Sequence, residues 1–193
     1  MKKVHCSSLK AKASDKTDIK IILHDRRTKI NSEMGFSIKS QLGGDSTLLN
    51  ASQATNFNFK IEGGEFSDDE INRINSLETK HKVLDRVNAI KEKGGRFVFD
   101  MVDNKIFYEN LMMLDGHLPI IIAYLLLEQL NTSDSKLKDL VKKVSEINPL
   151  QFNPERVFSI YAYKVKNLLT SVALGLMPNK AWDGRYDANG GYM

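Results

Sequence analysis

The hydrophobic pattern changes its period about a third of the way along the chain, and this change limits the folds open to the sequence. Residues 17–24 are β-branched and apolar, residues 35–41 alternate in character, and residues 56–61 place their apolar side chains on one face of an extended chain. The stretch 25–34 between the first two segments has turn character. A two-residue period is typical of strands. We therefore expect three strands in a small mixed sheet in the N-terminal half.

From residue 67 onward the pattern is mostly helical. Ser67 and Glu70 form a capping box, and Thr79 is a second capping residue. Residues 97–102 fit either a short strand or a loop. The predicted helices begin near Ser67, Thr79, Asn104, Leu118, Leu137 and Asn153, where the following Pro154 takes the first helical position. The fold class is thus α/β or α+β, with the strands leading and the helices following.

The organisation divides at residue 66. Residues 1–66 hold the predicted strands, and residues 67–193 are the helical part of the same domain. The tail at 182–193, WDGRYDANGGYM, combines turn-forming and aromatic residues and predicts a hairpin that stops within its first strand. We therefore expect the chain to be a fragment of a longer protein.

Several features argue against a secreted or membrane protein. Cys6 is the one cysteine, so no internal disulfide forms, which fits a reducing cytosol. The first residues are basic and polar, unlike a secretory signal. The apolar run 119–127 is far shorter than the roughly 20 residues that cross a bilayer, and predicts a buried helix. These observations favour a cytoplasmic protein.

Positive charge is concentrated near the N-terminus. Residues 1–30 contain nine Lys or Arg and three Asp, whereas the whole chain has a formal net charge of +4. Such a segment suits phosphate binding, because neutralised phosphates release their counterions. A solvated basic terminus without a partner explains the charge equally well.

An acidic residue and a lysine occupy neighbouring predicted strands. Asp18 begins the first strand and Lys39 lies within the second. Phosphodiester hydrolysis needs a hard cation held by carboxylates, together with a lysine that orients the attacking water or stabilises the developing charge. A hairpin through residues 25–34 would bring Asp18 and Lys39 to one cleft. The alternative is two half-exposed strands whose charges are solvated or form an ordinary ion pair.

The segments SDKTDIKIILHD and GFSIKSQLGGDSTLLNASQATNFNFKI resemble the core of HpaII-type restriction endonucleases, which belong to the PD-(D/E)xK nuclease class. The similarity is dense over residues 14–61 and extends more weakly to the tail. It implies a restriction-endonuclease-like core and Mg²⁺-dependent cleavage of double-stranded DNA at a short specific site, with CCGG as the expected sequence. It also implies a partner methyltransferase at the level of the system. Two active sites are needed to cut both strands, so we expect a homodimer or two successive nicks.

The resemblance also assigns residues to the catalytic site. Asp18 matches the first acidic metal ligand, and Ser37, Ile38 and Lys39 match the acidic-x-Lys motif. Lys39 is then the catalytic lysine, and the backbone carbonyl of Ile38 is a further metal ligand. Ser37 departs from the class pattern, because Asp or Glu is expected at this position.

Another oxygen donor is therefore expected to compensate for Ser37. Glu33 and Gln41 are both available, and Gln41 is preferred because it shares a strand face with Ser37 and Lys39.

Two segments carry donors and acceptors suited to DNA. The first follows Lys39 and offers the polar side chains of Asn50, Ser52, Gln53, Thr55 and Asn56. The second is the predicted hairpin turn with Arg26, Arg27 and Lys29. The alternatives are a polar turn that caps a short helix and ordinary surface charge.

Three functional interpretations remain. The first is a site-specific endonuclease, and the second is a truncated, non-catalytic DNA-binding relic of one, which Ser37 favours. The third is a helical interaction protein without a nucleic-acid role, and it leaves the organisation of residues 14–61 unexplained.

Overall fold

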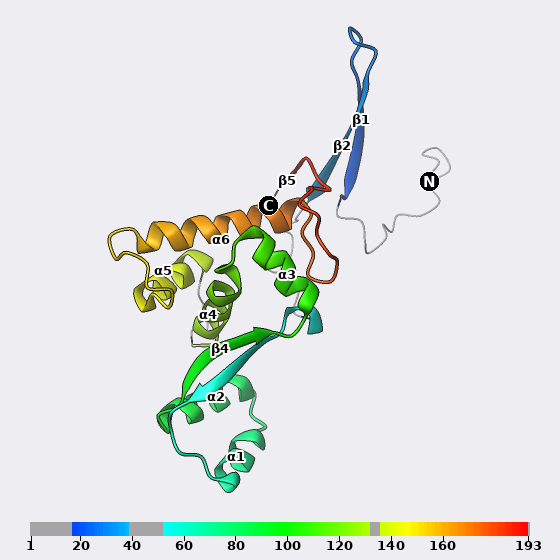
Figure 1. Cartoon of the computed structure of the whole chain (residues 1–193). Helices are drawn as coiled ribbons and strands as arrows, with labels where there is room; N and C mark the ends of the chain where they lie inside the picture. The colour runs from blue at the N-terminus through cyan, green and yellow to red at the C-terminus, as the bar shows by residue number, and fades with distance from the viewer. Residues whose placement is uncertain (1–16, 39–51, 132–135, 193) are drawn as a thin grey trace.

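The computed structural model describes residues 17–38, 52–131 and 136–192 (Figure 1). It is a mixed α/β structure with six helices among these residues, as the sequence predicts, but its strands form two small sheets rather than one, because β3 pairs with β4 and not with β1 or β2. The elements in chain order are β1 (Ile19–His24), β2 (Asn31–Ile38), the 3₁₀ helix η1 (Gln53–Thr55), β3 (Phe57–Glu62), α1 (Asp68–Asn75), α2 (Lys82–Glu92), β4 (Arg96–Val102), α3 (Lys105–Leu114), α4 (Leu118–Leu130), α5 (Leu137–Ile147), α6 (Val157–Leu174) and β5 (Gly190–Tyr192).

Helices α4 and α6 organise the core. One side of α4 packs with α3 and the C-terminal half of α6, where Phe107, Leu111 and Leu118 are fully buried. The other side packs with α5 and the N-terminal half of α6, around Ile121 and Tyr161. Burial of both sides explains why α4 is apolar nearly all round, and it confirms that the run 119–127 is a buried helix. Among the described residues, no single helix is long and apolar enough to cross a membrane, although α3 and α4 taken together, with a bend of 110°, meet the length and composition requirement.

The two sheets lie at opposite ends of this helical core (Figure 1). At one end, β3 pairs antiparallel with β4, so residues 97–102 form a strand rather than a loop. Phe57 of β3 meets Phe107 edge-on with ring centroids 6.2 Å apart, which joins this sheet to the core. At the other end, β1, β2 and β5 form a three-stranded sheet in the order β1-β2-β5.

The β1–β2 hairpin projects away from the helices (Figure 1). The prediction of two strands joined by a turn is confirmed, but its boundaries were wrong. β1 begins at Ile19 rather than residue 17, and β2 begins at Asn31, inside the predicted turn. The turn is closed by the Asp25 amide, which donates to the Ile30 carbonyl at 3.0 Å. Within the turn, Lys29 adopts the left-handed region at φ 61°.

The tail forms a strand, but not one that pairs with a following strand within the described residues. β5 runs parallel to β2, with Phe36 opposite Gly190 and Ile38 opposite Tyr192. The last residues of the chain therefore complete the sheet that the first described residues begin. The pairs β2–β5 and β3–β4 both cross the predicted division at residue 66.

Two helix starts also differ from the prediction. Asn153 and Pro154 belong to a turn that the Arg156 amide closes by donating to the Asn153 carbonyl at 3.0 Å, and α6 begins three residues after Pro154, at Val157. Thr79 does not cap α2; its hydroxyl donates to Asp85 instead. The capping box at Ser67 and Glu70 is confirmed.

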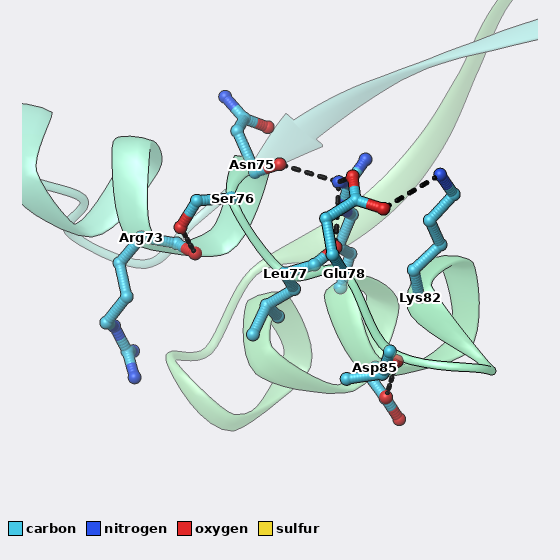
Figure 2. Close-up of polar contacts among 9 residues, drawn as sticks. Arg73, Asn75, Ser76, Leu77, Glu78, Lys82 and Asp85 are labelled. Atoms are coloured by element: carbon cyan, nitrogen blue, oxygen red, sulfur yellow. Dashed lines mark hydrogen bonds and ion pairs between the residues drawn. The ribbon is translucent and has the colours of Figure 1, made fainter.

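The link between α1 and α2 is held by one guanidinium. Arg86 donates to the carbonyls of Asn75 at 2.6 Å and Leu77 at 2.9 Å. Figure 2 labels these partners, Asn75 and Leu77, together with Glu78 and Lys82. Glu78 completes the contact, with an ion pair to Arg86 at 3.6 Å and another to Lys82 at 3.3 Å. These bonds satisfy carbonyls that follow the end of α1.

Candidate functional site

Asp18 immediately precedes β1 and lies beside Phe36, the residue before Ser37 in β2. Its amide donates to the carbonyl of Phe36 at 2.8 Å, and Ile19 pairs with Phe36. Asp18 and Ile19 therefore both lie next to Phe36, and the strand pairing itself begins at Ile19. The hairpin therefore brings Asp18 next to the strand that carries Ser37 and Ile38. Asp18 is exposed to solvent.

The rest of the second motif lies at the edge of the described structure. Ile38 is the last described residue of β2 and pairs with Tyr192 of β5. Lys39, Gln41 and Asn50 lie outside the described residues.

Glu33 is poorly placed to replace the missing carboxylate. It sits opposite Ile22, four residues before Ser37, which is roughly 13 Å along an extended strand. Its carboxylate forms an ion pair with Lys20 at 3.2 Å. Glu33 thus belongs to the outer part of the hairpin rather than to the surroundings of Asp18.

A close junction forms two residues before Ser37. A Cβ on Gly35 would lie 2.4 Å from Cγ2 of Thr17 and 3.2 Å from the backbone oxygen of Asp187, so only glycine fits without a shift. The Gly35 amide donates to Oδ1 of Asn189 at 2.9 Å, and the Asn189 amide donates back to the Gly35 carbonyl at 2.7 Å. The C-terminal segment is therefore fastened directly to β2.

Sequence reasoning did not identify this junction. Its signal is faint: an asparagine in the tail and a single glycine in a strand, which marks a close approach of another backbone. The pairing of residues this far apart in the chain leaves no local pattern.

The hairpin tip carries the predicted phosphate-binding arginines. Arg26 and Arg27 are both exposed, in the turn that follows β1. The Asp25 carboxylate accepts from the Arg27 amide at 2.8 Å, and this bond, with those from Thr28, holds the Asp25 pKa below its usual value. From Asp18 to the tip is seven residues, or about 23 Å of strand.

The described part of the polar segment forms η1 and its caps. Ser52 and Thr55 build a reciprocal capping box, in which the Ser52 amide donates to Thr55 Oγ1 at 3.1 Å and the Ala54 amide donates to Ser52 Oγ at 3.3 Å. Gln53 and Asn56 are exposed. The local structure is thus a polar turn that leads into β3, and the exposed amides are its available donors and acceptors.

Comparison with known proteins identifies the family of the chain. The model of the HpaII restriction endonuclease family matches residues 1–193, the whole chain. The chain belongs to the HpaII restriction endonuclease family. It is 42% identical over 193 residues to the type II restriction enzyme HpaII of Haemophilus parainfluenzae. That match covers 100% of this chain and 52% of the relative, so the chain spans about half the length of that enzyme. No solved structure matches the chain.

Restriction endonucleases of this kind imply a metal, and the donors around Asp18 suit magnesium. Mg²⁺ takes oxygen ligands, often one or two carboxylates, and keeps several waters. The exposed Asp18 carboxylate and the carbonyl of Ile38 are donors of this type. Across the described ranges, no group of three or more His, Cys, Asp or Glu is placed to hold a metal. A metal held by these two donors would take its remaining ligands from neutral oxygen donors of the chain, from water or from phosphate.

A second polar cluster, in the helical half, has a structural role. The Lys164 ammonium on α6 contacts the Asp115 carboxylate, lies 3.4 Å from His117 Nδ1, and sits 5.9 Å from the centre of the Phe152 ring. Burial acts to raise the Asp115 pKa, but the hydrogen bonds from Lys164 and His117 outweigh it and leave the pKa below its usual value. The cluster joins the α3–α4 corner to α6.

Proposed function

We propose that this chain carries the catalytic part of a type II restriction endonuclease, which hydrolyses phosphodiester bonds in double-stranded DNA at a short specific site with Mg²⁺. The single observation that carries this proposal is the bond of the Asp18 amide to Phe36, the residue before Ser37 in β2, in a chain of the HpaII restriction endonuclease family. The proposed site sequence is CCGG, by similarity to the HpaII-type enzymes.

The roles follow from the chemistry of the residues. Asp18 and the Ile38 carbonyl hold Mg²⁺, which when bound neutralises phosphate charge and acidifies a water. Lys39 donates to the attacking water or to the phosphate and stabilises the charge that develops there. Ser37 and Gln41 supply neutral oxygen donors where the class has a carboxylate.

The DNA lies along the hairpin and the polar segment in this proposal. Arg26 and Arg27 contact phosphates, because both are exposed at the tip of a projecting hairpin. The contacts from the polar segment come from Asn50, Ser52, Gln53, Thr55 and Asn56. We further propose a homodimer that cuts both strands, a cytoplasmic setting, and a methyltransferase that protects the host DNA.

A second candidate function is a DNA-binding relic without catalysis. The observation that favours it is Ser37 itself, since a serine hydroxyl is a weaker metal ligand than a carboxylate.

Plasmid cleavage with Mg²⁺ separates the two functions. The purified chain is compared with Asp18→Ala and Lys39→Ala, and with Glu33→Ala as the matched control. Glu33 is an exposed carboxylate on the same hairpin, but it faces Lys20 and lies away from Asp18. The nuclease predicts discrete fragments that disappear in the first two variants and persist in Glu33→Ala.

Each other outcome has a definite meaning. No cleavage with salt-sensitive DNA binding retained would establish the relic. Neither cleavage nor binding would overturn both functions. Loss of cleavage in Glu33→Ala as well would move the metal site toward the hairpin tip.

A further inference from the structure

Asn110 is a buried polar residue whose hydrogen bonds all serve one loop. It lies on α3 with 2% of its surface exposed, next to the fully buried Leu111. Its side-chain nitrogen donates to the carbonyls of Met177 at 3.0 Å and Lys180 at 2.8 Å. Its side-chain oxygen accepts from the Trp182 amide at 2.9 Å. A buried amide is costly unless paired, and here every bond holds the backbone of residues 177–182.

The same loop is fixed at its other end. The Ala188 amide donates to the Leu174 carbonyl at 3.0 Å, and Asn189 bonds the backbone of Gly35 in β2. Gly175 lets the returning chain pass close by, because a Cβ there would lie 2.9 Å from the Asp187 nitrogen. We call residues 177–189 the anchored loop. It runs from the helical core to the strand that carries Ser37 (Figure 1).

The anchored loop has a part that packs against the core and a part whose charged side chains are exposed, which we call the presented part. Trp182 packs against the α3–α4–α6 cluster, and its indole nitrogen donates to the Arg185 carbonyl at 2.7 Å. In contrast, the Arg185 side chain is 89% exposed and that of Asp183 is 69% exposed. Core packing thus explains the tryptophan, but it does not explain why exposed charged residues lie in a loop whose end at Asp187 and Asn189 is fixed to Gly35 of β2.

The charges of the presented part are balanced and loosely paired. Arg185 lies 3.8 Å from Asp183, and Lys180 lies 3.8 Å from Asp187. Exposed pairs at this distance exchange easily with other partners. With two cations and two anions, the loop adds no net attraction for phosphate. It does offer both donors and acceptors, which is what base edges in the major groove require.

We propose that the anchored loop reads base edges of the DNA site, with Arg185 as the contact residue and Asn110 as its positioning residue. This inference rests on the proposed nuclease function and deepens it. A base-edge contact needs a side chain held to a fraction of an ångström beside the cleavage site. The bonds from Asn110 and the junction at Gly35 supply that support from both sides.

The test measures the affinity of the full chain for two duplexes of equal length by fluorescence anisotropy, with Ca²⁺ in place of Mg²⁺. One duplex contains the site found by sequencing the cut ends, or by selection from random duplexes if the chain binds without cutting. The other lacks that site. Arg185→Ala should weaken binding of the specific duplex by about 5- to 150-fold, the range expected for a bidentate base contact. Binding of the non-specific duplex and the salt slope should stay unchanged.

Two variants and a control sharpen the result. Arg185→Lys keeps the charge but not the planar fork, so it should not restore specific binding. Arg73→Ala removes an exposed arginine from α1, at the far end of the molecule, and should change neither affinity (Figure 1). Asn110→Ala should lower the ratio of specific to non-specific affinity and speed hydrogen exchange in residues 177–189, at a temperature where its circular dichroism remains that of the parent chain.

Three outcomes would overturn the inference. An equal loss on both duplexes, or full rescue by Arg185→Lys, would make Arg185 a phosphate contact. No loss in Arg185→Ala would make the loop purely structural. In both cases the parent chain still binds its site, so the proposed function stands. Failure of the parent chain to bind either duplex would overturn the proposed function, and this inference with it.

Discussion

The Asp18 amide donates to the carbonyl of Phe36 at 2.8 Å, which places Asp18 beside the residue that precedes Ser37 in β2. The family position for the first acidic ligand and the position for the second motif are thus set by one hairpin. A serine at the second position leaves one carboxylate at this point of the ladder. The first prediction follows from that shortage.

Ser37→Asp should strengthen metal binding. A second carboxylate beside Asp18 gives Mg²⁺ a charged ligand in place of a neutral one. We expect the Mg²⁺ concentration for half-maximal plasmid cleavage to fall by about tenfold, which corresponds to roughly 1.4 kcal/mol. The matched control is Ser32→Asp, which adds the same charge to β2 opposite Leu23 and should leave the Mg²⁺ requirement unchanged. An unchanged requirement in Ser37→Asp would place the metal elsewhere.

Gly35→Ala should separate the anchored loop from the sheet. The added methyl group would meet Thr17 Cγ2 at 2.4 Å and the Asp187 carbonyl oxygen at 3.2 Å, so both chains must shift. Overpacking of this kind costs about 1–3 kcal/mol, which thermal unfolding monitored by circular dichroism will show. We also expect cleavage to be lost, because the shift occurs two residues from Ser37.

Gly116→Ala is the control for that substitution. A Cβ at Gly116 would have ordinary contact with Met112 Cε at 3.6 Å. We expect no loss of cleavage there. If Gly35→Ala lowered neither cleavage nor thermal stability more than Gly116→Ala does, the chains around Gly35 would adjust more easily than their distances indicate.

Local signals in the sequence predicted most of the helices. The capping box at Ser67 and Glu70 fixes the start of α1, and the apolar run 119–127 predicts the buried α4, because both depend on residues within a few turns of one another. The start of α6 was wrong because the Asn153 side chain caps a turn rather than the helix itself. The start of β2 was wrong because residues 31–34 carry no strand pattern of their own and are ordered by pairing with β1.

The candidate site was predictable only in part. Asp18 and Ser37 emerged from the family resemblance, and the hairpin sets Asp18 beside Phe36, the residue before Ser37. Asn110 and Asn189 did not emerge, because their partners lie 67 to 72 residues away for Asn110 and 154 residues away for Asn189. An asparagine in an apolar helix indicates that its side chain is hydrogen-bonded, but the sequence does not indicate to which residue. Only the fold supplies that information.

Asp115→Asn should lower the free energy of unfolding at pH 7 and make that free energy depend less steeply on pH in acid. The Asp115 pKa lies below its usual value, so its ionised form stabilises the fold above the unfolded pKa of about 3.9, and this contribution is lost as the pH falls through the folded value. The substitution leaves the largely buried Lys164 ammonium without its charged partner, which lowers the free energy of unfolding by about 1–3 kcal/mol.

Urea unfolding between pH 7 and pH 3 measures this difference. Asp139→Asn, on the exposed face of α5, is the control and should stay within about 0.5 kcal/mol of the parent chain. A parallel acid loss in the parent chain and Asp115→Asn would mean that other carboxylates govern acid unfolding.

The double variant Arg26→Ala, Arg27→Ala should weaken DNA binding in a way that depends on salt rather than sequence. Both arginines are exposed at the hairpin tip, about 23 Å of strand from Asp18, where they can reach phosphates but not the bond to be cut. Each phosphate contact contributes about 0.9 to the slope of log affinity against log salt, so the slope should become shallower by about 2. Specific and non-specific duplexes should lose affinity equally.

The control for charge alone is Lys138→Ala, Lys142→Ala, which removes two exposed cations from α5. We expect its salt slope to match that of the parent chain, because α5 lies on the far side of the helical core from the hairpin (Figure 1). Equal slopes in both double variants would show that the hairpin tip is ordinary surface charge. A shallower slope in the hairpin variant alone, beside an unchanged slope in Arg185→Ala, would divide the protein's DNA contacts into phosphates at the tip and bases at the anchored loop.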